Sequence, residues 1–113
     1  MRPRRDNRKG SSKGQSEAPR YQLVLSRAAA KDLQSLPPKL IKQLQNKCLP
    51  VLSVNPRGAG NPKHGPLAGL YSYNFGPRRG YRIVYEVVDS ERLVVVIAIG
   101  PHDQAYRRAR RRI

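Results

Sequence analysis

The sequence is poor in cysteine, in acidic residues and in long apolar runs. Its single cysteine, Cys48, cannot form an intrachain disulfide, which fits a reducing compartment. The longest apolar run, residues 93–99, is too short to cross a bilayer, and the N-terminus has no apolar stretch typical of a secretory signal. These absences predict a cytoplasmic protein that does not enter a membrane.

Metal-ligating residues are also scarce. The chain has two histidines and one cysteine, and their spacing does not match any common metal site. We therefore expect neither a metal nor another cofactor. Cys48 is expected to be a small core residue rather than a nucleophile.

Basic residues, in contrast, are abundant and concentrated at both ends. The 23 lysines and arginines face seven acidic residues, which gives a net charge of +16. Residues 1–20 hold seven basic and two acidic residues, and residues 107–113 hold five arginines and no acidic residue. We predict a disordered basic arm (1–20), one domain (21–106) and a basic C-terminal tail (107–113). The charge favours a polyanionic partner such as RNA, DNA, the ribosome or an acidic protein.

Two β-rich runs dominate the second half of the chain. Residues 81–88 alternate between two faces, and residues 93–99 are apolar at every position, which is typical of a strand inside a sheet. The polar residues 89–92 predict a hairpin between them. One face of the first run carries Arg82 and Glu86 beside valines, and we look there first for a site.

Weaker patterns predict the remaining elements. Residues 21–26 and 70–75 are expected to be strands, residues 27–36 a helix that Ser26 caps, and residues 55–66 a loop. A second helix carries Leu40, Leu44, Cys48 and Leu52 at helical spacing, and Pro50 predicts a kink or an early end near Leu49. Residues 103–112 are expected to form a short basic helix.

The predicted fold is α+β, in the order β-α-α-β-β-β. We expect a four-stranded antiparallel sheet with the first strand beside the last, and a helix hairpin that leaves and returns at the same end of the sheet. The hairpin would cover one face. The other face, with Ser72, Asn74, Arg82 and Glu86, would be partly open.

Four segments occur in a fixed order along the chain. They are NPR at 55–57, PKHGPLAGLYSYNFG at 62–76, YRIVYEV at 81–87 and VVVIAIGPHDQAY at 94–106. Over residues 21–106 this order and spacing resemble the RelE/ParE toxin superfamily of toxin–antitoxin pairs. The resemblance implies a RelE-like fold and an acidic antitoxin that holds the toxin silent in a hetero-oligomer. RelE-like members cut mRNA in the decoding site of the ribosome, whereas ParE-like members inhibit DNA gyrase.

The RelE-like chemistry would be a metal-independent transesterification. The 2′-hydroxyl of the RNA attacks the phosphate, which requires a base, cations around the phosphate and an acid for the leaving 5′-oxygen. The resemblance places the phosphate-holding arginine at Arg82, the base-stacking tyrosine at Tyr106 and the proposed acid at His102. The alternative for Arg82 is a structural ion pair with Glu86, and Tyr106 or His102 can equally be a packing or an exposed residue.

Four other basic residues are predicted to bind RNA. They are Arg57, Lys63, Arg78 and Arg79. Two lysines on the second strand of potent family members fall on Ser72 and Asn74, so the chain lacks two cations of the family pattern. A ParE-like gyrase inhibitor and a non-catalytic RNA-binding protein therefore remain as alternatives to a ribosome-dependent endoribonuclease.

The basic arm gives a first test. Because its composition suits electrostatic binding rather than folding, deletion of residues 1–19 is expected to leave the melting temperature nearly unchanged. The same deletion should weaken RNA binding, most strongly at low salt. Calorimetry and RNA-binding titrations at several salt concentrations measure both effects. A large drop in melting temperature would show that the arm packs on the domain.

Overall fold

The computed structural model describes residues 20–113, so all of the predicted basic arm except Arg20 lies outside the described residues. Its elements are listed here in chain order: β2 (Gln22–Leu25), α1 (Arg27–Gln34), α2 (Pro38–Gln43), a π-helical turn (Leu44–Cys48), α3 (Leu49–Val54), α4 (Pro56–Ala59), β3 (Asn61–Pro62), a 3-10 turn (Gly65–Leu67), β4 (Tyr71–Phe75), a second 3-10 turn (Pro77–Arg79), β5 (Tyr81–Val88), a third 3-10 turn (Asp89–Glu91), β6 (Leu93–Pro101) and α5 (His102–Arg112). Within this range no helix is long and apolar enough to span a bilayer.

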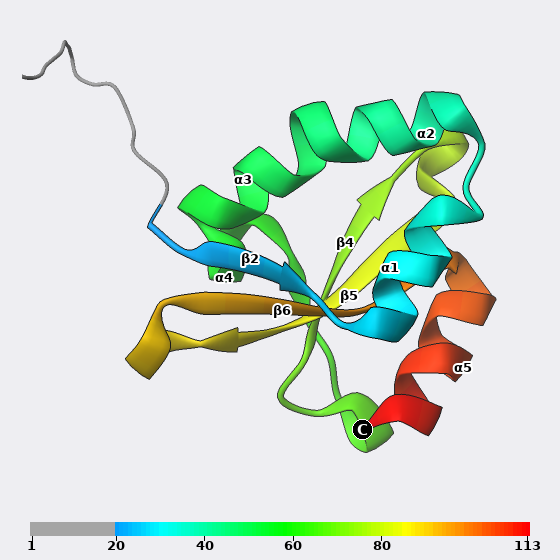
Figure 1. Cartoon of the computed structure of the whole chain (residues 1–113). Coiled ribbons are helices and arrows are strands. Elements are labelled where there is room, and N and C mark those ends of the chain that lie inside the picture. The colour runs from blue at the N-terminus through cyan, green and yellow to red at the C-terminus, as the bar shows by residue number, and fades with distance from the viewer. Residues whose placement is uncertain (1–19) are drawn as a thin grey trace, which may run out of the picture.

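The strands form one five-stranded mixed sheet in the order β2-β6-β5-β4-β3 (Figure 1). The prediction that the first strand lies beside the last is confirmed. The prediction of a four-stranded antiparallel sheet is wrong in two respects. β2 runs parallel to β6, and the segment predicted as a loop contains a short fifth strand, β3, paired with β4.

The unequal helices explain the parallel pairing. α1 has eight residues, whereas α2, the π-helical turn and α3 continue without interruption from Pro38 to Val54. This longer arm reaches back to the start of β2, where the Ser53 carbonyl accepts hydrogen bonds from the amides of Arg20 and Tyr21, both at 3.0 Å. The chain thus returns to the end of the sheet where β2 begins, not to the end where β2 stops.

Pro50 does not end the second helix. The helix passes through it, and the irregularity lies in the π-helical turn immediately before it, where the Leu49 amide donates to the Leu44 carbonyl. Proline has no amide hydrogen and crowds the preceding turn, and a wider π turn accommodates both defects.

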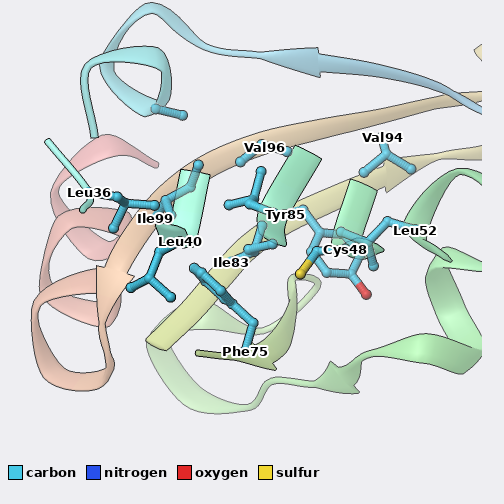
Figure 2. Packing of buried hydrophobic residues seen from close by; sticks show 12 residues of the cluster. Leu36, Leu40, Cys48, Leu52, Phe75, Ile83, Tyr85, Val94, Val96 and Ile99 are labelled. Carbon is cyan, nitrogen blue, oxygen red and sulfur yellow. The ribbon is translucent and has the colours of Figure 1, made fainter. Parts of the chain in front are cut away.

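The main core lies between the helices α1–α3 and one face of the sheet. Figure 2 shows Phe75, Ile83 and Tyr85 of the sheet close to Leu40 and Leu52 of the helices. The alternation predicted for residues 81–88 is confirmed, because Ile83 and Tyr85 are fully buried here. Cys48 belongs to the same core, and burial raises the pKa of its thiol to about 11, as suits a structural residue.

α5 covers part of the opposite face. Ala105 and Ala109 lie four residues apart on one side of the helix, and their small side chains are buried against the sheet. A β-bulge shifts the register between Val84 and Tyr85, so that Ile97 and Ala98 of β6 both belong to this second core. Glu86 stays exposed on this face, whereas Ser72 is only 1% exposed.

A buried carboxylate, that of Asp32 in α1, ties α5 to the domain. One carboxylate oxygen accepts hydrogen bonds from the Ile99 amide at 3.0 Å and from Arg112 at 2.7 Å, and the other accepts from Arg112 at 3.2 Å. The guanidinium of Arg108 lies 3.5 Å from the same carboxylate and donates to the Ile99 carbonyl at 2.7 Å. The predicted boundary at residue 107 therefore falls inside α5.

Replacement of Asp32 by alanine should be strongly destabilising. It would leave two arginines without their buried partner, a change that costs about 3–5 kcal/mol of unfolding free energy in comparable pairs. Urea unfolding measures the loss. Glu91→Ala removes an exposed carboxylate and serves as the control with little expected effect. A loss below about 1 kcal/mol for Asp32→Ala would show that α5 is not held by this carboxylate.

Candidate active site

The candidate site lies on the second face of the sheet, where β4, β5, the segment after β3 and the start of α5 meet. α5 is joined to the turn before β5, because the His102 amide donates to the Gly80 carbonyl at 2.9 Å. Arg78 and Arg79 occupy that turn, both exposed and both with positive φ (54° and 55°). Two exposed cationic residues therefore lie in the turn that is joined to the first turn of α5.

Tyr106 of α5 is the centre of the site. Its hydroxyl accepts a hydrogen bond from Lys63 Nζ at 3.0 Å and donates one to Ser72 Oγ at 3.3 Å. The Lys63 ammonium also lies 4.4 Å from the centroid of the Tyr106 ring. Lys63 itself is held because its amide donates to the Leu70 carbonyl at 2.9 Å, beside the β3–β4 pair.

The surroundings of Tyr106 lower the pKa of its phenol. Burial alone raises this pKa, but hydrogen bonds to Ser72, Lys63 and Arg82, together with the charge of Lys63, outweigh burial. These partners stabilise the phenolate more than the neutral phenol. Tyr106 therefore gives up a proton more readily than an ordinary tyrosine.

Arg82 of β5 points into the same region. Its guanidinium donates to the carbonyls of Arg79 and of Tyr81, the latter at 3.1 Å. Within residues 20–113 it makes no ion pair with Glu86, so the structural alternative for Arg82 finds no support. Two backbone contacts fix the guanidinium and leave other N–H groups available to a ligand.

His102 stands at the first position of α5, exposed, with its ring 4.8 Å from the Tyr106 ring in an edge-on arrangement. Its Nδ1 lies 2.8 Å from the Asp103 carboxylate. The carboxylate at this ring nitrogen orients the imidazole. The arrangement suits a proton donor next to Tyr106.

The structure brings together most of the predicted site residues, but not all. Arg82, His102, Tyr106 and Lys63 converge, and the turn that carries Arg78 and Arg79 is next to them, since the Arg79 carbonyl accepts a hydrogen bond from Arg82. Arg57 lies elsewhere, since its guanidinium binds Asp89 beyond the far end of β5 and the Tyr71 hydroxyl at 2.8 Å. We call the group of Arg82, His102, Tyr106 and Lys63 the tyrosine site.

Sequence reasoning missed two features of the tyrosine site. Lys63 was predicted only to bind RNA, and its contact with Tyr106 joins residues 43 positions apart. Ser72 was counted as a missing lysine, whereas it is a buried support for the Tyr106 hydroxyl. The period-two pattern of β4 places Ser72 on this face, but its burial depends on α5. Across residues 20–113, His, Cys, Asp and Glu side chains do not gather in groups that suit a metal ion.

The chain is similar to toxins of bacterial toxin–antitoxin systems. A family model described as "ParE toxin of type II toxin-antitoxin system, parDE" matches residues 23–106. Toxin RelE of Mycobacterium tuberculosis is 35% identical over 88 residues, which are 77% of this chain and 87% of the relative. Toxin RelG of the same organism is 32% identical over 89 residues, which are 78% of this chain and 98% of the relative.

Solved structures give the same result. An Escherichia coli toxin RelE, solved in the free state as an arginine-to-alanine double mutant, has a TM-score of 0.68 and 29% identity, with 82% of this chain and 97% of that chain covered. The toxin–antitoxin complex RelBE2 of M. tuberculosis has a TM-score of 0.67 and 28% identity, with 75% and 100% covered. The intact E. coli RelBE toxin–antitoxin complex has a TM-score of 0.60 and 31% identity, with 73% and 96% covered.

The Tyr106 hydroxyl offers a direct test of the site geometry. Lys63→Met removes a hydrogen bond and a charge that lower the pKa of Tyr106 while burial persists, so this pKa should rise. NMR titration of the labelled tyrosine ring measures the change, and Lys39→Met, at an exposed position of α2, is the control. An unchanged Tyr106 pKa in Lys63→Met would contradict the described contact.

Proposed function

Because this chain belongs to the RelE/ParE superfamily and is a RelE-family toxin of a type II toxin–antitoxin pair, we propose that it inhibits translation as a ribosome-dependent endoribonuclease that cuts mRNA. The observation that carries the proposal is the tyrosine site. An arginine, a lysine, a histidine and a tyrosine of lowered pKa meet on a partly open face. Metal-free cleavage of RNA requires such groups.

Arg82 holds the scissile phosphate in this proposal. A guanidinium presents several parallel N–H groups, which match the oxygens of a phosphate and stabilise the charge that develops on it. The contacts of Arg82 with two backbone carbonyls orient the group before the substrate arrives. Such preorganised charge supplies a large part of the rate acceleration in phosphoryl chemistry.

Tyr106 and His102 divide the two proton transfers. Because the pKa of the Tyr106 phenol is lowered, Tyr106 is suited to act in the base step, in which the proton of the attacking 2′-hydroxyl is accepted. The exposed His102 imidazole, oriented by Asp103, delivers a proton to the leaving 5′-oxygen.

Lys63 replaces the missing lysines of β4. The family pattern places lysines at Ser72 and Asn74, and Ser72 has no room for one because it is buried beneath Tyr106. Lys63 brings an ammonium group to the same spot from the segment after β3, 3.0 Å from the Tyr106 hydroxyl. The local positive charge of the family pattern is thereby retained from a different segment of the chain.

An acidic antitoxin is the expected partner. Relatives of this fold have been solved as toxin–antitoxin complexes. The exposed cations Arg78 and Arg79 and the half-buried Arg82 would attract an acidic segment, which would block the phosphate position.

Arg82→Ala separates catalysis from folding. We expect cleavage to fall by two to three orders of magnitude, as when a single oxyanion donor is lost, while the melting temperature barely changes. Primer extension on mRNA in translating ribosomes detects the cuts. Arg27→Ala removes an exposed arginine of α1 and is the charge-matched control.

The same assay discriminates the alternatives. Cuts within codons that disappear in Arg82→Ala but persist in Arg27→Ala support the endoribonuclease. If the wild type makes no cuts and gyrase supercoiling stops, the protein is a ParE-like inhibitor. If neither occurs and RNA is bound with a steep salt dependence, it is a binding module without chemistry.

A further inference from the structure

A second group of arginines lies at the end of the sheet away from the tyrosine site. A cavity of about 160 Å³ is lined there by residues of the start of β2, the end of α3, α4 and the hairpin after β5. Its charged lining residues are Arg20, Arg57 and Arg92, which come from three separate segments, and no acidic side chain lines it. We call this cavity the arginine pocket. In Figure 1, it corresponds to the region where β2 begins, next to α3 and α4.

Asp89 fixes the position of Arg57 without filling the pocket. One of its carboxylate oxygens accepts a hydrogen bond from the Tyr21 hydroxyl at 2.7 Å, and the other pairs with the Arg57 guanidinium. Arg57 also donates to the Tyr71 hydroxyl at 2.8 Å. Two of the five N–H donors of Arg57 are thus directed at Asp89 and Tyr71, and the others are available to an anion.

The backbone that carries Arg57 is closely packed. The Tyr85 hydroxyl donates to the Pro56 carbonyl at 2.6 Å, and Asn55 Oδ1 accepts from the Gly58 amide at 3.1 Å. A Cβ at Gly60 would lie 2.0 Å from the Tyr85 hydroxyl, so the chain passes directly over this buried tyrosine. Arg57 therefore projects from a well-anchored segment rather than from a loose loop.

Arg92 completes the pocket from the hairpin. It has a left-handed conformation with φ of 53°, and its guanidinium lies 5.8 Å from the centroid of the Tyr21 ring. This cation–π contact holds the side chain over Tyr21, the residue just before β2. Three arginines line the pocket and one carboxylate, that of Asp89, pairs with one of them, so the pocket keeps an excess of positive charge.

We propose that the arginine pocket binds a backbone phosphate of RNA, as a second contact that holds the RNA but takes no part in its cleavage. The inference rests on the proposed function, because it names where else the RNA partner is bound. Planar guanidinium groups from several directions suit a phosphate, which accepts hydrogen bonds on all of its oxygens. The pocket has room for one such group.

The position of the pocket favours RNA over an acidic protein. Arg20 lines it, and the chain that precedes Arg20 carries six further basic residues and two acidic ones. Pocket and arm are therefore continuous along the chain, and a run of dispersed cations suits the regularly spaced charges of a nucleic-acid backbone. Arg82 and Asp89 lie near opposite ends of β5, roughly 20 Å apart, so one RNA can contact both sites.

A charge-matched pair of double variants tests the proposal. Arg57→Gln/Arg92→Gln removes two charges from the pocket, and Lys39→Gln/Lys42→Gln removes two exposed charges from α2. The probe is a short single-stranded polyuridylate, bound to the full chain at several salt concentrations. The pocket variant should bind at least about tenfold more weakly than the control, with a salt slope smaller by about 0.7 for the lost phosphate contact. Arg57→Lys keeps the charge and loses the planar group, and should weaken binding in part.

Ribosome assays separate this inference from the proposed function. In cleavage on translating ribosomes the pocket variant should raise KM and leave kcat unchanged, whereas Arg82→Ala lowers kcat. If the wild type cuts nothing, the polyuridylate titration still tests the pocket. Equal affinities and slopes for the two double variants would overturn the proposal. It would also be overturned if the pocket variant bound RNA normally but lost affinity for an acidic antitoxin.

Discussion

The arrangement of the molecule depends on one buried carboxylate. Removal of a charge from water is costly, and Asp32 is compensated only because an amide of β6 and two arginines of α5 reach it together. This requirement fixes where α5 lies. Since Tyr106 stands on the same helix, about 1.7 turns before Arg112, the position of the tyrosine follows from a contact made at the other end of α5. A basic C-terminus, which looks like a tail in the sequence, is in part the clamp that builds the site.

Local patterns predicted the elements well, and contacts between distant segments limited the rest. The alternation at residues 81–88 and the apolar run at 93–99 are properties of the strands themselves, and both strands are confirmed. The predicted direction of β2 relative to β6 was wrong because it depends on how long the helices are before the chain returns to the sheet. β3 was missed because two residues in a segment rich in glycine and proline carry no periodicity, and only their pairing with β4 makes them a strand.

The candidate site was predictable to a similar extent. The resemblance to the RelE/ParE superfamily pointed to Arg82 and Tyr106, and the structure brings the two residues together. Lys63 and Ser72 were assigned other roles because their meeting with Tyr106 requires the β3–β4 pairing and the docking of α5 at once. Arg57 was grouped with the site on charge alone, yet Asp89 and Tyr71 hold it at the other end of the sheet. The composition of the chain gives the number of cationic residues but not their positions in the fold.

The excess charge therefore serves distinct purposes within the described part of the chain. Arg108 and Arg112 pair with Asp32 and contribute to stability. Arg78, Arg79 and the arginine pocket keep positive charge that is available to a partner. Like charges held close together repel, and this repulsion destabilises the folded state unless a bound polyanion neutralises the charges. RNA and an acidic antitoxin would relieve the same repulsion at Arg78, Arg79 and Arg82. Competition between them would then need no conformational switch, since the partner that covers Arg82 excludes the other by occupying its charge.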